Sequence, residues 1–127
     1  MTLEMNKRFI ERYFEAIKKD KSLATLNQFI AEQPLKDHVA GYDAVLPGYW
    51  LESDDMVAVG DKVAVRFTLH GTHKGEFMGV PPTGKRVSFQ GLIIYQIKEG
   101  RIVDHWMQVD MVSFMQQIGA LPAPVVA

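Results

Sequence analysis

The chain has 127 residues, a formal net charge of -1 and 23% charged side chains, which fit one globular domain with one core. It contains no cysteine, which excludes disulfides, thiolate catalysis and thiolate metal sites. The basic residues are spread along the chain, and no apolar run is long enough to cross a bilayer. We therefore expect a cytoplasmic protein that binds neither nucleic acid nor a membrane.

The first third of the chain predicts two helices. Apolar residues at helical spacing between charged neighbours indicate an amphipathic helix over residues 2–19. Ser22 is a candidate N-cap for a second helix over residues 22–30, which Pro34 would end. We expect the connection over residues 33–48 to be irregular, with at most a short helical turn.

The rest of the chain predicts two β-hairpins. Gly60-Asp61 joins the first pair of strands, and Lys98-Glu99-Gly100 joins the second. A turn-rich stretch separates the hairpins, and a short helix over residues 111–118 follows them. The expected strands span residues 49–59, 62–72, 86–97 and 101–109.

Helices followed by a meander of long strands predict an α+β fold. Helices packed across a strongly curved, mixed but mainly antiparallel sheet would form a cone-shaped α+β barrel, and such a concavity suits a hydrophobic small molecule. We expect a single domain over residues 1–119 and a loosely attached tail over residues 120–127.

Two stretches resemble a known family. Residues 71–85 read GTHKGEFMGVPPTGK and resemble the GTHxGxFxGxPPTGK stretch of the SnoaL-like polyketide cyclases. Residues 94–106 read IYQIKEGRIVDHW and resemble the family's "iyRi-DGKIvExW" hairpin. Asp110 then follows at the family's usual distance, before a QQIG ending that resembles its "RQLG".

The resemblance implies a cone-shaped α+β barrel, often a homodimer. It also implies cofactor-free ring closure by intramolecular aldol condensation, with an Asp as general acid and base that Asp110 matches. Gln96 departs from the family, because the best-known cyclases carry a histidine near that position beside the Asp. The segment 40–50 is shorter than the corresponding helix of relatives. Because of these two departures, the resemblance does not identify the substrate.

Asp110 is the first candidate catalytic residue. If the second hairpin closes with a three-residue loop, Asp110 shares a face with an apolar wall that would favour proton transfer to and from its carboxylate. A two-residue turn would swap the faces, and Asp directly before a helix is also a preferred N-cap. From the residues alone both roles stay open. The predicted wall, which would contact substrate, consists of Leu92, Ile94, Gln96, Ile102, Trp106 and Gln108.

Other candidates surround this wall. Gln96 could hydrogen-bond a substrate carbonyl or its enolate, and His38 could be a second acid–base group in the connection where pocket mouths form. Arg66 and His70 share the mixed face of their strand and could orient polar substrate groups. The aromatic rings of Tyr13 and Trp50 are further substrate-binding candidates. We expect His73 to fix the glycine-rich turn rather than to contact substrate.

The opposite face of the second hairpin is too apolar for solvent, and we assign it to a dimer interface. It carries Tyr95, Val103, His105, Met107 and Val109. We predict no metal site, since His70 and His73 lack an acidic partner at ligand spacing. We predict no cofactor, because residues 75–84 lack the ending of a phosphate loop.

Three functions follow as hypotheses. The first is a cofactor-free cyclase or isomerase acting on a polyketide-like carbonyl compound. The second is a non-catalytic protein that binds a hydrophobic small molecule. The third is an epoxide hydrolase, which needs two carboxylates around an arginine, and for which Arg66 and Asp110 supply two of three members.

Overall fold

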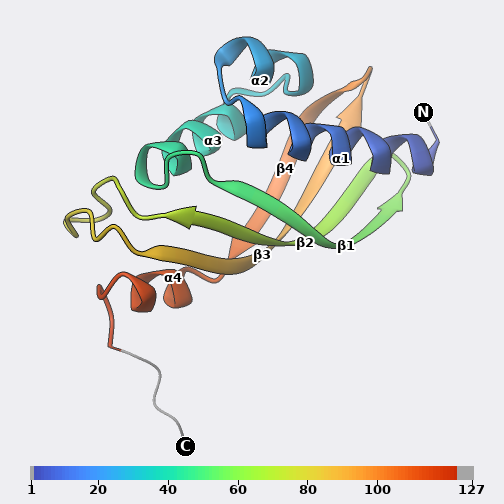
Figure 1. Ribbon diagram of the computed structural model, residues 1–127. Helices are drawn as coiled ribbons and strands as arrows, with labels where there is room; N and C mark the ends of the chain where they lie inside the picture. The colour runs from blue at the N-terminus through green and yellow to red at the C-terminus, as the bar shows by residue number, and fades with distance from the viewer. Residues whose placement is uncertain (1, 123–127) are drawn as a thin grey trace, which may run out of the picture.

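The computed structural model describes residues 2–122, in which four helices accompany one sheet (Figure 1). Its elements are α1 (Leu3–Lys19), α2 (Leu23–Phe29), α3 (Gln33–Val45), β1 (Trp50–Val59), β2 (Lys62–Thr72), β3 (Arg86–Lys98), β4 (Arg101–Val109) and α4 (Met111–Gln117). The tail predicted for residues 120–127 falls largely on residues 123–127, which lie outside the described range.

Both of the first two helices begin at a side-chain N-cap, and Ser22 is the one that the sequence predicted. The Thr2 hydroxyl accepts a hydrogen bond from the Met5 amide at 3.1 Å, and the Ser22 hydroxyl accepts one from Thr25 at 3.4 Å. The apolar stripe of α1 is buried against the sheet and contacts β1 most extensively. Its buried apolar members are Phe9, Ile10, Tyr13, Phe14 and Ile17.

The expectation of an irregular connection over residues 33–48 is wrong, because most of it forms α3. Pro34 lies in the first turn of this helix instead of ending the previous one. Proline is well tolerated in the first turn of a helix, where its missing N–H has no intrahelical partner to lose. Leu35 and Val39 are the buried residues of α3, and they hold the helix over the open side of the sheet.

The four strands form one curved antiparallel sheet in the order β1-β2-β3-β4 (Figure 1). A single parallel bridge joins Ile30 to Ile102 at its edge. The turn between β3 and β4 has two residues, Glu99 and Gly100, whose positive φ values of 51° and 74° match a type I′ hairpin. The register then shifts, because Gln96 pairs with Asp104 while Ile97 pairs with Ile102. Val103 is thus the extra residue of a β-bulge.

Helices α1, α2 and α3 cover the concave face of the sheet, and α4 lies at the far end of β3 (Figure 1). This confirms the α+β fold with a strongly curved sheet. The Gln117 side chain accepts a hydrogen bond from the Ser88 amide and donates one to the Ser88 carbonyl, which fixes α4 to β3. In the part of the chain that is described, no helix is both long and apolar enough to cross a membrane.

Candidate functional site: a cavity beneath α3 and its imidazole pair

The concave face of β3 and β4 is not the face that the sequence predicted. Tyr95, Met107 and Val109 line the interior, whereas Leu92 and Trp106 lie on the outer face with 58% and 48% of their surface exposed. The predicted substrate wall of Leu92, Ile94, Trp106 and Gln108 is therefore wrong, and so is the dimer face assigned to Tyr95, His105, Met107 and Val109. Both errors have one cause: these residues were grouped on the correct faces, because the bulge at Val103 compensates for the two-residue turn, but both faces are apolar and the outer one was taken for the inner one.

The interior of the cone is narrow. A cavity of about 30 Å³ lies between the sheet and helices α1 and α3, a volume that suits one or two oxygen-sized groups. The core side chains fill the remaining interior. The cavity is lined by Tyr13, Leu35, His38, Val39, Tyr42, Tyr49, Leu51, Phe67, Leu69, Ile93, Tyr95, Met107 and Val109.

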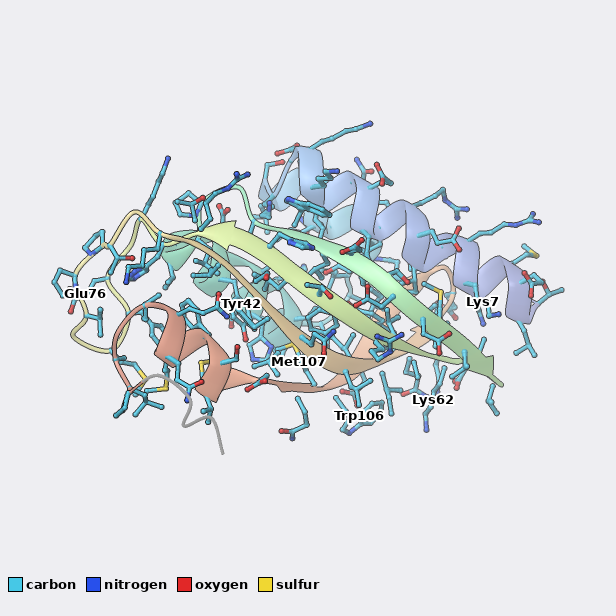
Figure 2. The ribbon with its side chains drawn as sticks, turned by 60° about the horizontal axis from the view of Figure 1, so that its bottom comes forward. Lys7, Tyr42, Lys62, Glu76, Trp106 and Met107 are labelled. Carbon is cyan, nitrogen blue, oxygen red and sulfur yellow. The ribbon has the colours of Figure 1, made fainter. Side chains whose placement is uncertain are left out.

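A wider groove continues from this cavity. It has a volume of about 330 Å³ and runs between α3, β4, α4 and the loop at Phe77. His38, Tyr42 and Met107 line both spaces and so mark the boundary between them. Figure 2 labels Tyr42 and Met107. A groove of this size lies at the lower end of the range for small-molecule sites.

Three polar side chains form a chain at this boundary. Glu32 Oε1 accepts a hydrogen bond from His105 Nδ1, and the two side chains are only 11% and 7% exposed. His105 Nε2 lies 3.2 Å from His38 Nδ1, and the two rings meet edge-on. Glu32 stands at the N-cap position of α3 but makes no capping hydrogen bond, because its carboxylate turns to His105 instead.

When Glu32 is ionised, hydrogen-bonding chemistry determines where the protons of this chain lie. An ionised carboxylate can only accept, so His105 Nδ1 carries a proton. In a neutral His105 the Nε2 atom then accepts from His38 Nδ1, and His38 Nε2 is left with a lone pair. When one proton is added, His105 donates to His38 and His38 Nε2 carries a proton. The arrangement can therefore take up and return a proton at His38, at the mouth of the cavity.

Asp110 lies outside this arrangement. It is exposed, and its Oδ1 accepts a hydrogen bond from the Ser113 amide at 3.0 Å as the N-cap of α4. Its backbone amide donates to the Gln90 carbonyl, six positions along β3 from Gln96. At about 3.3 Å per residue that separation is roughly 20 Å, so Asp110 and Gln96 do not share one site. Gln96 instead donates to Asp61 Oδ2 at 3.0 Å.

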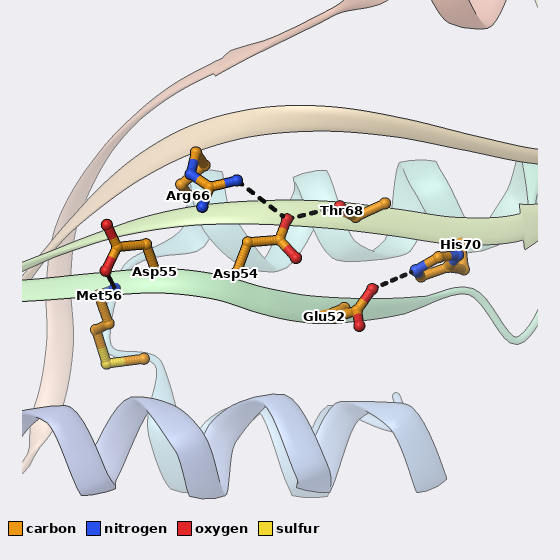
Figure 3. Close-up of polar contacts among 7 residues, drawn as sticks. All are labelled: Glu52, Asp54, Asp55, Met56, Arg66, Thr68 and His70. Atoms are coloured by element: carbon orange, nitrogen blue, oxygen red, sulfur yellow. Dashed lines mark hydrogen bonds and ion pairs between the residues drawn. The ribbon is translucent and has the colours of Figure 1, made fainter.

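Arg66 and His70 lie on the outer side of β2, in a row of polar contacts with β1 (Figure 3). His70 Nε2 lies 2.9 Å from Glu52, and its ring stacks on that of Trp50 at 4.3 Å. Arg66 lies 3.9 Å from Asp54, not beside Asp110. Asp54 does place a carboxylate next to the arginine, but the pair is outside the cone. None of these outer residues lines the cavity or the groove beneath α3.

Tyr13, one of the predicted substrate-binding candidates, lines the cavity. His73 also follows expectation: it is fully buried, its Nδ1 lies 2.9 Å from the Thr83 hydroxyl, and it accepts from the Thr83 amide. These contacts tie the two ends of the glycine-rich turn together.

Glu32 and His105 are the residues that the sequence did not assign to a site. They are 73 positions apart, and Glu32 meets His105 from the N-cap position of α3. The available signal for the helix start was Pro34 in its first turn, two positions after Glu32, but nothing in the sequence pairs Glu32 with His105.

One group within residues 2–122 has the donor set of a metal site. Ligand atoms of Glu32, Asp104 and His105 all lie within 4.8 Å of one another. Each is already engaged, since Glu32 bonds His105 and Asp104 Oδ1 accepts from the His105 amide at 2.8 Å. A divalent cation at this place would replace the proton on His105 Nδ1 and interrupt the hydrogen-bonded chain to His38.

Known proteins share this architecture. A model of the SnoaL-like polyketide cyclase family matches residues 20–118. Aklanonic acid methyl ester cyclase DnrD of Streptomyces peucetius is 32% identical over 69 residues, which are 54% of this chain and 48% of that protein. The chain thus spans about half the length of this curated relative.

Two solved structures extend the likeness to nearly the whole chain. AclR of Streptomyces galilaeus, a proposed hydroxylase, superposes with a TM-score of 0.84 at 26% identity, covering 98% of this chain and 87% of AclR. IdmH of Streptomyces antibioticus, a proposed polyketide cyclase, superposes with a TM-score of 0.75 at 29% identity, covering 90% and 98%. The resemblance first read from residues 71–119 is thereby confirmed, and the chain belongs to the SnoaL-like polyketide cyclase family.

Proposed function

We propose that this protein is a cofactor-independent acid–base enzyme that closes a ring, or shifts a double bond, in a hydrophobic carbonyl compound. The observation that carries the proposal is the hydrogen-bonded chain from buried Glu32 through His105 to His38, which ends at the boundary between an apolar cavity and a groove of substrate size. Family membership supports the same class of reaction.

The reaction would run as proton transfer followed by carbon–carbon bond formation. His38 Nε2 removes a proton from the carbon next to a carbonyl, and the electron pair of that C–H bond moves onto the carbonyl oxygen to give an enolate. The enolate carbon attacks a second carbonyl of the same molecule, and the new alkoxide takes the proton back from His38. Every proton removed is returned, so no oxidant or reductant is needed. Return of the proton to a different carbon would give an isomerisation.

Glu32 and His105 would act as positioning residues. With Glu32 ionised, its carboxylate keeps a proton on His105 Nδ1 and stabilises the positive charge that reaches His105 when His38 becomes protonated. Removal of the carboxylate would leave His105 free to adopt the other tautomer, in which Nε2 donates to His38 and orients it differently.

The test follows the first proton transfer directly. Aklanonic acid methyl ester, the compound in the name of the relative DnrD, is incubated with the protein in D₂O. NMR then follows the loss of its α-proton signals and the appearance of any cyclised product. The wild type should accelerate the exchange. His38→Ala should abolish it, and Glu32→Gln should lower it by about 10²-fold or more and shift its pH profile.

Three comparisons separate the alternatives. Asp55→Asn changes an exposed carboxylate of β1 that lines neither the cavity nor the groove, and it should leave exchange intact. Asp110→Asn tests the Asp suggested by the family resemblance, and loss of exchange there with full activity in His38→Ala would move the acid–base role to Asp110. Loss of activity on addition of a chelator would favour a metal at Glu32, Asp104 and His105.

If tight binding occurs with no exchange in any variant, the non-catalytic binding hypothesis replaces this proposal. The epoxide hydrolase hypothesis has the weakest support, because Arg66 and Asp54 form their pair on the outer face.

A further inference from the structure

All four tyrosines of the chain line the same cavity. They come from four separate places in the sequence: Tyr13 on α1, Tyr42 on α3, Tyr49 just before β1 and Tyr95 on β3. Apart from His38 the other lining residues are apolar, and none of the described lining residues is Lys or Arg. The phenol hydroxyls are therefore the principal hydrogen-bond donors available inside this space.

Tyr13 and Tyr95 line the cavity, and their hydroxyls make no hydrogen bond within residues 2–122. Both residues are 1% exposed, and within residues 2–122 no hydrogen bond is made by a tyrosine hydroxyl. The enclosed side-chain atoms that lack a partner in this range are Asn6 Oδ1 and His73 Nε2, and no tyrosine oxygen is among them. Tyr13 and Tyr95 both line the cavity, which is the space beside these two buried side chains. Buried polar groups normally have hydrogen-bond partners, so these hydroxyls are free to donate to a ligand.

The cavity keeps these hydroxyls neutral. Burial raises the pKa of Tyr13, Tyr49 and Tyr95 well above the ordinary value of 10.0, and repulsion between neighbouring phenolates raises it further. The nearby Glu32 carboxylate adds to the effect at Tyr13. The phenols consequently stay protonated at neutral pH and can donate to a negatively charged oxygen without ionising themselves.

We propose that the hydroxyls of Tyr13 and Tyr95, with Tyr49 and Tyr42 beside them, form a subsite that binds the anionic oxygen of an enolate or a phenolate. The inference rests on the proposed function and names its substrate class. A cavity of about 30 Å³ admits an oxygen but not a ring, whereas the groove of about 330 Å³ beyond His38 has room for the carbon skeleton. The ligand is therefore a flat apolar compound with an enolisable carbonyl or a phenol oxygen at one narrow end.

The position of His38 agrees with this orientation. It lines both the cavity and the groove, so it meets a bound molecule next to the oxygen that enters the cavity. When the carbonyl oxygen of a ligand enters the cavity, the α-carbon of that ligand lies next to His38. Charge that develops on the oxygen during proton removal would be met by donors that are already in position, which lowers the barrier more than donors that must first reorient.

The experiment uses 4-nitrophenol, whose phenolate is seen by its visible absorbance, with 4-nitroanisole as a neutral ligand of similar shape. The whole protein is titrated at a pH where the free phenol is mostly protonated. The wild type should increase the phenolate absorbance of 4-nitrophenol on binding. Tyr13→Phe and Tyr95→Phe remove only an oxygen each and should weaken phenolate binding about tenfold or more, because each lost hydrogen bond is to a charged acceptor. Binding of 4-nitroanisole should change little.

Ser53→Ala serves as the control, since it removes an exposed hydroxyl of β1 that lines neither the cavity nor the groove and should bind both ligands as the wild type does. Circular dichroism confirms that each variant is folded. The inference is overturned if the wild type gives no phenolate signal at millimolar ligand, or if both phenylalanine variants keep wild-type affinity.

The result is separable from the proposed function, because the titration needs no turnover. Tyrosine-dependent phenolate binding in a protein that exchanges no α-proton would leave the subsite standing and remove the enzymatic role. Exchange of the α-proton that is unchanged in Tyr13→Phe and Tyr95→Phe would leave the enzymatic role standing and remove the subsite.

Discussion

The contact between the glycine-rich turn and the end of α3 gives a prediction of large effect. The amides of Lys74 and Gly75 both donate to the Val45 carbonyl, at 3.1 Å and 3.0 Å. A Cβ atom added at Gly75 would lie 1.9 Å from the Ala44 carbonyl oxygen, more than 1 Å inside the 3.0 Å that real Cβ contacts essentially never cross. The obstacle is backbone, which cannot rotate away as a side chain does.

In Gly75→Ala the turn must therefore separate from α3. Loss of the two hydrogen bonds costs about 2 kcal/mol and the residual crowding about 1–3 kcal/mol, so the free energy of unfolding should fall by about 3–5 kcal/mol. For a chain of this length that corresponds to a Tm lower by roughly 10–20 °C. Thermal unfolding followed by circular dichroism measures it.

Gly41→Ala is the matched control for this variant. Gly41 lies inside α3, and a Cβ added there meets no atom within 4 Å. The substitution should raise the free energy of unfolding by about 0.5–1 kcal/mol, because alanine favours a helix interior over glycine. A Gly75→Ala protein that melts within 2 °C of the wild type would refute the described packing of the turn on α3.

Three further predictions concern the cap, the outer face and the tyrosines. Asp110→Ala should cost about 1 kcal/mol in urea unfolding through the lost cap of α4, whereas Asp110→Asn should keep most of it. We expect a homodimer formed through the outer sheet face, where Trp106 lies in one row with Val57, Ala64 and Ile94, so light scattering should find a dimer that Trp106→Glu converts to a monomer. Because folding raises the pKa of Tyr13, its contribution to stability is complete below pH 10 and is lost as the pH rises above that value. In urea unfolding above pH 10, Tyr13→Phe should make the decline shallower by about 1.4 kcal/mol per pH unit, and an unchanged slope would contradict the burial of its hydroxyl.

The elements that the sequence predicted correctly have strong local signals. The amphipathic stripe of α1, the Ser22 cap and the Gly60-Asp61 turn each act within a few residues. The segment that became α3 has a weaker pattern, with Gly41 inside and Pro34 at its start. A proline there is compatible with the end of one helix or the start of the next, and packing of Leu35 and Val39 on the core decides between them.

The candidate site was harder to predict because it depends on which side of a strand faces inward. Alternation placed Ile94 and Trp106 on the same face correctly, but apolar residues on both sides of β3 gave no reason to choose the side with Tyr95 as the inner one. The contact of Glu32 with His105 arises from tertiary packing, for which spacing carries no signal. Tyr13 was identified because it lies on the inner stripe of a helix, where only one side is apolar.

The bulge at Val103 affects how residue roles are transferred between relatives. A relative that lacked this one residue would present its next positions on the opposite side of β4, so that residues matching His105 and Met107 would face outward. An ungapped alignment across this point would still place them in the same columns. Residues in the same alignment column of β4 therefore need not occupy the same position in the structure. A catalytic role assigned in one family member holds for another only when β4 carries the same bulge in both.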